Sequence, residues 1–377
     1  MSFSDLRACR PVVAALAMST VTIALGGCSS TPSQQAATPA GAKQTNAVQR
    51  AAAIVRPIIK VAQPGGVGCV AVKINVGAGA PPWWGAINCT NGLAYNLPGV
   101  PKPVPLVLPP GTVNEKAYDV DSRGFVVGVA ITAAGLPLPT VWNPGGAPVA
   151  GWPTGPCGVP PIQGIAAGLY KGGFPGFPIV GQTTVPGPSQ ACWWFPGPHP
   201  IPPPPGPLTS IAYDVNSQQV YVGQLAGRAA AGPGPGGPLA PIAGTSPASV
   251  AYAINTASTI VGQQDLGPGC GALPQGAGFI GPFGGAAAIV PPLGGDCRAG
   301  LEDLNDQNGA VGFSFHPVLQ QAMGFNLALP YPPGVFNINT GVVGPWIDLS
   351  DAPGIDDKQR IIATDTGAVP SQVYVIL

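Results

Sequence analysis

A twelve-residue pattern that recurs along the chain constrains its fold more than any other feature. Each copy has an apolar residue, then an Asn or Asp four positions later, then a short apolar run that ends in Gly or Ala. Hydrophobic residues alternate before and after a central turn, which predicts a β-hairpin. Five copies are clear: "AYDVDSRGFVVG" (117–128), "AYDVNSQQVYVG" (212–223), "AYAINTASTIVG" (251–262), "LEDLNDQNGAVG" (301–312) and "APGIDDKQRIIA" (352–363).

Two weaker copies complete a regular spacing. One ends at Gly181 with an inserted turn, and the other begins at Ala71–Asn75 and is followed by "WWGAINC". We call the Asn or Asp that opens each turn the anchor, and successive anchors lie about 39 to 51 residues apart. Repeats of this length are typical of propellers and solenoids. The anchors are Asn75, Asp121, a position near 171, Asn216, Asn255, Asn305 and Asp356.

The strands of the repeat are apolar on both faces, as "FVVGVAI" (125–131) illustrates. A sheet of this kind must be covered on both sides, and a closed ring of sheets leaves no terminal face uncovered. We therefore predict an all-β fold, a β-propeller of about 45-residue repeats with seven blades, or six if Ala71–Asn75 belongs only to the closing strand. The uncharged last strand "VYVIL" is expected to pair with an N-terminal strand near Val70–Ile74.

The repeat resembles the HAF family of bacterial extracellular repeats, in which an Ala-x-x-Ile-Asn hairpin precedes a His-Ala-Phe-x-Trp strand. Ala251, Ile254 and Asn255 match the hairpin, and Gln190–Trp194 ("QACWW") stands where the second motif falls, although no copy keeps the His. The resemblance covers roughly residues 117–377. It implies an extracellular β-repeat fold and no particular activity.

The anchors raise the question of metal binding. Counted from Asp119 as an EF-hand calcium loop, Asp121 and Gly124 fit positions 3 and 6, but Ala130 replaces the essential acidic residue at position 12. Asn and Asp also open tight turns by accepting backbone hydrogen bonds, and Gly supplies the positive φ that follows. We therefore predict structural turns and no metal site.

The sequence supplies few groups for catalysis. His199 and His316 are the two histidines, each next to Pro, and the acidic pair Glu302–Asp303 is expected to lie on the surface beside a turn. No nucleophile elbow, zinc motif or phosphate loop is present, so no catalytic residue and no cofactor is predicted. The pairs Trp83–Trp84 and Trp193–Trp194 could stack against sugars, but aromatic side chains in blade cores are the commoner arrangement.

The N-terminus reads as a targeting segment. Arg7 and Arg10 precede an uncharged apolar stretch from Pro11 to Leu25, too short for a membrane span. Leu25–Cys28 ("LGGC") resembles the lipobox of bacterial lipoproteins, which implies lipidation of Cys28 with acyl chains such as palmitate. Ser29 after the cysteine favours the outer membrane by the same resemblance. An ordinary secretory signal is the alternative.

These signals divide the chain into a lipoprotein signal peptide (1–27), a lipidated N-terminus and flexible tether (28–60) and a β-propeller-like repeat domain (61–377). Without residues 1–27, which contain Arg7, Arg10 and Asp5, 13 basic and 14 acidic residues remain. A formal charge of −1 gives no electrostatic reason to bind nucleic acid. The expected partners are the membrane, through the lipid anchor, and a protein or glycan ligand.

Six cysteines follow Cys28, an even number that predicts disulfides in an oxidising compartment. Sequential pairs each fall within about one repeat, so we predict Cys69 with Cys89, Cys157 with Cys192, and Cys270 with Cys297. Each bond is expected to attach a long Gly/Pro loop to the neighbouring sheet. Buried free thiols are the alternative.

Function is predicted only as a class. A lipid-anchored envelope propeller that binds a ligand or acts as a scaffold needs no titrating group, because loops on a rigid framework suffice. The expected binding loops are the Pro/Gly connections 97–111, 196–208 and 231–247 around one rim. An envelope enzyme acting on a polymer, of the lyase or hydrolase class, and a purely structural surface protein are the alternatives.

Overall fold

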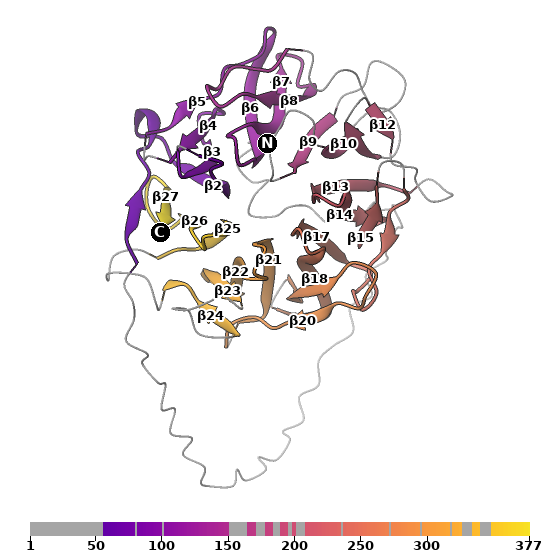
Figure 1. The fold of residues 1–377 in the computed structure, drawn as a ribbon. Helices are drawn as coiled ribbons and strands as arrows, with labels where there is room; N and C mark the ends of the chain where they lie inside the picture. The colour runs from indigo at the N-terminus through magenta and orange to yellow at the C-terminus, as the bar shows by residue number, and fades with distance from the viewer. Residues whose placement is uncertain are drawn as a thin grey trace, which may run out of the picture.

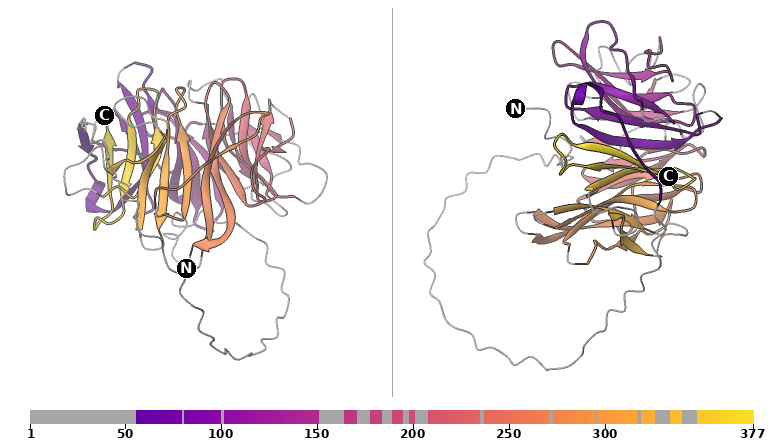
Figure 2. Two further views of the ribbon diagram at one scale, coloured as in Figure 1. Left: turned by 90° about the horizontal axis from the view of Figure 1, so that it is seen from below. Right: turned by 90° about the vertical axis from the view of Figure 1, so that its left-hand side faces the viewer.

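Seven small antiparallel sheets stand in a ring, so the chain forms a seven-bladed β-propeller (Figure 1). The computed structural model describes residues 56–79, 81–99, 102–150, 164–170, 178–183, 189–194, 198–200, 208–234, 237–270, 273–294, 296–316, 319–325, 334–339 and 348–377. Cys28 and the predicted signal peptide lie outside these residues. Figure 2 shows the ring from the side, with strands crossing from one face to the other. The predicted propeller is confirmed with seven blades, not six.

The blades follow one another along the chain, and each begins with its innermost strand. Blade 1 contains β2 (Cys69–Val76), β3 (Trp83–Cys89), β4 (Ala94–Pro98) and β5 (Val104–Pro105). Blade 2 contains β6 (Thr112–Val120), β7 (Val126–Thr132) and β8 (Pro137–Trp142). Blade 3 contains β9 (Gly164–Leu169), β10 (Ile179–Thr183), β11 (Ala191–Trp194) and β12 (Pro198–Pro200).

The second half of the ring repeats the same order. Blade 4 contains β13 (Ser210–Val215), β14 (Val220–Leu225), β15 (Arg228–Pro233) and β16 (Ala240–Pro241). Blade 5 contains β17 (Ser249–Ile254), β18 (Thr259–Cys270), β19 (Leu273–Pro282) and β20 (Ala288–Val290). Blade 6 contains β21 (Arg298–Leu304), β22 (Ala310–His316), β23 (Leu319–Phe325) and β24 (Val335–Asn337). Blade 7 contains β25 (Asp351–Ile355), β26 (Ile361–Asp365) and β27 (Gln372–Ile376).

The two ends of the propeller close the ring in blade 7. Strand β1 (Ile58–Lys60) is the outermost strand of this blade and pairs antiparallel with β27, Ile59 opposite Val375. The expected partner, Val70–Ile74, was wrong, because these residues belong to β2 and pair with β3. The closing strand also starts just before residue 61, where the repeat domain was predicted to begin. A 3-10 turn, Pro64–Gly66, connects β1 to β2.

A glycine in the second strand of most blades has a specific steric cause. The inner strand carries a β-bulge before the anchor, for example between Ala212 and Asp214 in blade 4. A Cβ atom at Gly223 would collide with the carbonyl oxygen of Ile211, and one at Gly262 with that of Val250. A strand glycine commonly marks such a close approach of another backbone. The Val-Val-Gly ending of the repeat is therefore a consequence of the bulge.

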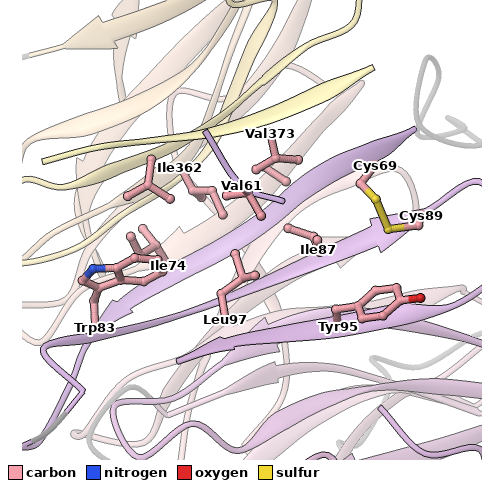
Figure 3. Packing of buried hydrophobic residues seen from close by; sticks show 12 residues of the cluster. Val61, Cys69, Ile74, Trp83, Ile87, Cys89, Tyr95, Leu97, Ile362 and Val373 are labelled. Atoms are coloured by element: carbon pink, nitrogen blue, oxygen red, sulfur yellow. A yellow bond between two sulfur atoms is a disulfide. The ribbon is translucent and has the colours of Figure 1, made fainter. Parts of the chain in front are cut away.

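Buried apolar clusters fill every seam between neighbouring blades. Figure 3 shows the seam between blades 7 and 1, where Ile362 and Val373 face Ile74 and Trp83. Successive side chains of a strand point to opposite faces. Trp83 thus packs toward blade 7, while its neighbour Trp84 packs toward blade 2.

The second tryptophan pair does the same in blade 3. Trp193 belongs to the cluster shared with blade 4, and Trp194 to the cluster shared with blade 2. The exposed fractions of their side chains are 1% and 2%. Both tryptophan pairs are core residues, which excludes stacking against a sugar at these positions in the folded ring.

Parts of the expected binding loops are outer strands. The connections 97–111, 196–208 and 231–247 contain β5, β12 and β16, each the outermost strand of its sheet, while residues 100–101, 196–197, 201–207 and 235–236 lie outside the described part of the chain. These outer strands contain proline, which lacks a backbone N–H. Proline on an edge strand protects it from pairing with another chain.

One predicted disulfide is confirmed, with a different structural role. Cys69 and Cys89 are bonded and stand directly opposite each other in β2 and β3. The bond therefore joins two strands of one blade and does not attach a loop. Cys192 and Cys297 are each disulfide-bonded. Their predicted partners remain predictions, because Cys157 and the side chain of Cys270 lie outside the described residues.

We predict that peptide mapping of the non-reduced protein will find Cys157 linked to Cys192, and Cys270 linked to Cys297. Each linkage bridges positions within about one repeat, as the Cys69–Cys89 bond does across 20 residues. Peptides that link a cysteine of blade 3 to one of blades 5 or 6 would contradict the sequential scheme.

Candidate functional site at the ring axis

The inner strands of the seven blades surround the centre of the ring (Figure 1). Because each blade runs outward as antiparallel strands, every inner strand ends on one face and begins on the other. The face that carries the Asn and Asp anchor turns is called the Asx face. The face where the inner strands begin is called the entry face.

The anchors bend the chain, as predicted. The Oδ1 atom of Asp121 accepts hydrogen bonds from the backbone N–H groups of Arg123 and Phe125, both at 2.9 Å. Asn305 makes the same bonds to Gln307 and Gly309 at 3.0 and 2.9 Å. Each anchor oxygen therefore replaces backbone partners that the turn lacks. The carboxylate of Asp121 is fully buried by this arrangement.

The anchors also connect the blades, which the sequence pattern did not reveal. An asparagine side chain both accepts and donates, so its Nδ2 group remains available after Oδ1 has capped the turn. Nδ2 of Asn216 donates to the carbonyl oxygen of Asn255 at 2.9 Å, and Nδ2 of Asn255 donates to that of Asn305 at 3.1 Å. Nδ2 of Asn305 continues the series to Asp356 at 3.3 Å.

At Asp356 the series changes, because a carboxylate cannot donate. Arg360 pairs with Asp356 at 2.6 Å and donates to the carbonyl oxygen of Pro82 in blade 1 at 2.8 Å. The guanidinium group thus replaces the missing amide donor at the seam where the ring closes. Its charge is compensated by a buried carboxylate.

Two residues before the anchor lies a second set of buried polar groups. Asp119, Asp214 and Asp303 occupy this position in blades 2, 4 and 6, and their side chains are at most 3% exposed. The Oδ2 atom of each accepts a backbone N–H of the following blade at 2.9 Å. The donors are Leu169, Ile254 and Ile355.

Lys73 occupies the same position in blade 1, and its Nζ atom lies 2.8 Å from Oδ1 of Asp303. This ion pair connects blade 1 to blade 6 past the inner strand of blade 7. Gly354 of blade 7 provides the space for Lys73, because a Cβ atom at Gly354 would lie only 3.0 Å from Cα of Lys73. We call Lys73, Asp119, Asp214 and Asp303 the axial charge layer.

Half-buried side chains lie on the same strands, on the entry side of this layer. In a ring whose sheets cover each other, a side chain on the innermost strand can reach water only toward the axis or at the strand ends. The bulge residues Tyr118, Tyr213 and Glu302 are half-buried, as is Lys116. The rings of Tyr213 and Tyr252 lie 6.0 Å apart, so the bulge side chains of blades 4 and 5 meet.

Charged groups complete this lining. The ammonium group of Lys116 lies 5.3 Å from the ring centre of Tyr118, within the range of a cation–π contact. Glu302 and Asp351 are half-buried at inner-strand positions of the neighbouring blades 6 and 7. These half-buried side chains combine aromatic rings, an ammonium group and carboxylates, which suits a ligand with both apolar and polar parts.

A buried carboxyl group stands at the start of the inner strand of blade 2. Glu115 is 4% exposed, and Oε1 accepts the N–H group of Ala94 at 3.1 Å, while Oε2 has no hydrogen-bond partner. In blades 4 and 5 the equivalent serines, Ser210 and Ser249, accept the same kind of bond. Burial raises the pKa of Glu115 from 4.5 to about 7, although the bond from Ala94 lowers it.

The structure separates the residues that the sequence singled out. Asp303 of the acidic pair is fully buried in the axial charge layer, contrary to the surface position expected for it. Glu302 is half-buried beside it. His199 lies in the outer strand of blade 3 and His316 at the end of β22 in blade 6, so the ring does not bring them together.

Comparison with known proteins leaves the chain without an assigned family. No family model matches the sequence, and no curated protein matches it. Within the described residues, no helix is long and apolar enough to cross a membrane. No three His, Cys, Asp or Glu side chains of the same part of the chain are arranged to hold a metal ion.

We predict that Glu115→Gln stabilises the propeller at pH 8. The folded pKa exceeds the unfolded value, so the wild-type protein loses stability as the pH rises from about 4.5 to about 7, and the amide removes this loss. An unscreened charge would contribute ~1.4 kcal/mol for each unit of pKa shift. Residual hydration screens the charge of Glu115, so we expect a smaller total gain of about 1–2 kcal/mol at pH 8.

Urea unfolding at pH 5 and pH 8 measures this gain. The variant retains Oε1 as the acceptor for Ala94, so its stability at pH 5 should remain close to that of the wild type. An equal change at both pH values would show that Glu115 is not protonated in the folded protein.

Proposed function

We propose that the chain is an envelope lipoprotein whose propeller binds a protein or glycan ligand at the axis, from the entry face. The half-buried lining of Tyr118, Tyr213, Glu302 and Asp351 is the observation that carries the proposal. These aromatic and carboxylate residues stand on the innermost strands of four different blades, which surround the axis. A rigid framework lowers the ordering cost of binding.

The framework is rigid for reasons visible in the blades. Every seam contains a buried apolar cluster, and the anchor and axial side chains connect the inner strands. Side chains held in this way need little rearrangement to meet a ligand. The same rigidity would serve a scaffold, in which a partner contacts the entry face without entering the axis.

The remainder of the proposal concerns the N-terminus. The lipobox-like segment ending at Cys28 and the small polar residues after it support a lipid anchor and a tether, and the acyl chains would hold the domain at the outer membrane. The HAF-like repeat supports an extracellular setting. The Cys69–Cys89 disulfide agrees with an oxidising compartment.

We predict that Cys28→Ser releases the protein from the membrane fraction. The thiolate that accepts the lipid would be missing, and one or two remaining apolar contacts cannot replace acyl chains. Cell fractionation combined with mass spectrometry of the N-terminus measures the effect, with Cys9→Ser as the control. Membrane retention of the serine variant with an unmodified N-terminus would contradict the lipoprotein proposal.

We predict that Tyr213→Ala weakens ligand binding at least tenfold, since a central aromatic contact is worth roughly 1–3 kcal/mol. The measurement is binding of the tether-free propeller to an array of envelope polysaccharides and to purified envelope proteins. Phe283→Ala is the matched control, because Phe283 is an exposed aromatic residue on the Asx face. Its backbone N–H group donates a hydrogen bond to the carbonyl oxygen of Ser258.

The same array discriminates the alternatives. Turnover of a polymer that disappears in Glu302→Ala would favour the envelope enzyme. Equal loss of binding in the Phe283 and Tyr213 variants would place the contact outside the axis, and no binding to any probe would favour the purely structural protein.

A further inference from the structure

The three axial aspartates each accept a backbone N–H group of the following blade but differ in their charge environments. Asp119 accepts the N–H groups of Val120 and Leu169 at 2.8 and 2.9 Å, and Asp214 accepts those of Val215 and Ile254 at the same distances. Asp303 accepts a hydrogen bond from the backbone N–H group of Ile355 and also contacts the ammonium group of Lys73. The ion pair at the axis therefore belongs to Asp303.

Asp119 lies among groups that do not neutralise it. The ammonium group of Lys73 forms its ion pair with Asp303 and attracts the Asp119 carboxylate only from a greater distance. The carboxylate of Asp214 repels that of Asp119. The strands packed against β6 are β2, β3, β4, β7 and β9, and Lys73 on β2 is their one acidic or basic side chain. On β6 itself the other charged residues are Glu115 and Lys116.

A carboxylate in this position has a large cost. Asp119 is 3% exposed, so water cannot hydrate the charge, and two backbone N–H groups offset only part of the lost hydration. A neutral carboxylic acid avoids this cost and the repulsion from Asp214. Burying the protonated carboxyl group therefore costs less free energy than burying the carboxylate.

We propose that Asp119 is a proton-binding site of the folded ring, which takes up a proton in mildly acidic solution and releases it toward neutral pH. The propeller then becomes less stable as the pH of its medium rises from acidic toward neutral. The proposal does not depend on a ligand or on the lipid anchor.

The direction follows from the linkage between protonation and folding. Burial raises the pKa of Asp119 above its ordinary value of 3.8, Lys73 lowers it, and Asp214 raises it again, with burial the largest effect. The folded state thus holds a proton that the unfolded chain has already lost. Stability is highest below the unfolded pKa and declines as the pH rises through the folded one.

The first test is a titration of the wild-type protein. Carboxyl carbon chemical shifts of ¹³C-aspartate-labelled protein are followed by NMR between pH 4 and pH 9, and the signal missing in Asp119→Asn assigns the residue. We expect this signal to titrate at least two pH units above an exposed aspartate. Titration in the ordinary range near pH 4 would overturn the proposal.

A second test uses stability and separates Asp119 from Glu115. In the Glu115→Gln background, one proton bound only by the folded state changes the unfolding equilibrium constant by up to tenfold per pH unit. Replacing Asp119 by Asn in this background should remove that dependence between pH 5 and pH 7. An unchanged dependence in the double variant would assign the proton elsewhere and overturn the proposal.

A third variant tests the environment and does not alter Asp119. Asp214→Asn removes the repulsion, so the Asp119 signal should titrate at a lower pH than in the wild type. This variant keeps one acceptor oxygen for the inner-strand donors. A titration that does not move, or moves upward, would exclude the axial charge layer as the cause of proton binding.

Discussion

The structure depends on the fact that both faces of every blade are apolar. A sheet with one polar face can end at water, but these sheets bury tryptophan, isoleucine and valine on both sides, as Trp83 and Trp84 show in adjacent positions. Each blade must therefore be covered by two neighbours. Only closure satisfies this for the first and last blades, and β1 accomplishes it by joining the C-terminal blade. The edges that remain lie at the circumference, where the outermost strands of blades 1 to 4 contain proline.

Closure creates a second constraint at the axis, where inner strands crowd and backbone groups lose water. The ring meets it with short polar side chains that bond the next blade: Asn255 through its amide nitrogen and Asp214 through its carboxylate. Larger residues would not fit, because inner strands approach so closely that glycine is needed at Gly168 and Gly354. The polar side chains that hold the ring together are therefore distinct from the half-buried lining proposed to bind a ligand. This separation allows Tyr213 to be replaced without loss of the anchor bonds.

Features that depend on local residue spacing were predictable from the sequence, whereas features that depend on contacts between distant segments were missed. Alternation around Asn255 or Asp356 determines a hairpin, and the spacing of such hairpins determines the repeat, so blade number and turn chemistry were predictable. The three-residue strand Ile58–Lys60 has no local pattern, and only its partner β27 makes it a strand. The roles of Asp119 and Asp303 were missed for the same reason. Two residues before an anchor looks like the approach to a surface turn, whereas curvature of the ring buries that position against the next blade.

In the axial charge layer, two residue types alternate from blade to blade, and this alternation cannot continue unbroken around an odd number of blades. Aspartate in blades 2, 4 and 6 alternates with Gly168, Ala253 and Gly354 in blades 3, 5 and 7. A Cβ atom at Gly168 would collide with the backbone of Asp214, and one at Gly354 with the backbone at Lys73 and Ile74, so the small residues allow the inner strands to approach each other. A period of two cannot close on seven positions, so blade 1 must depart from both residue types. A fourth aspartate there would face Asp119 across one seam and add another buried negative charge. Lys73 instead spans the small residue of blade 7 and neutralises Asp303. The charge that this single lysine cannot neutralise remains around Asp119, where the ring is expected to bind a proton.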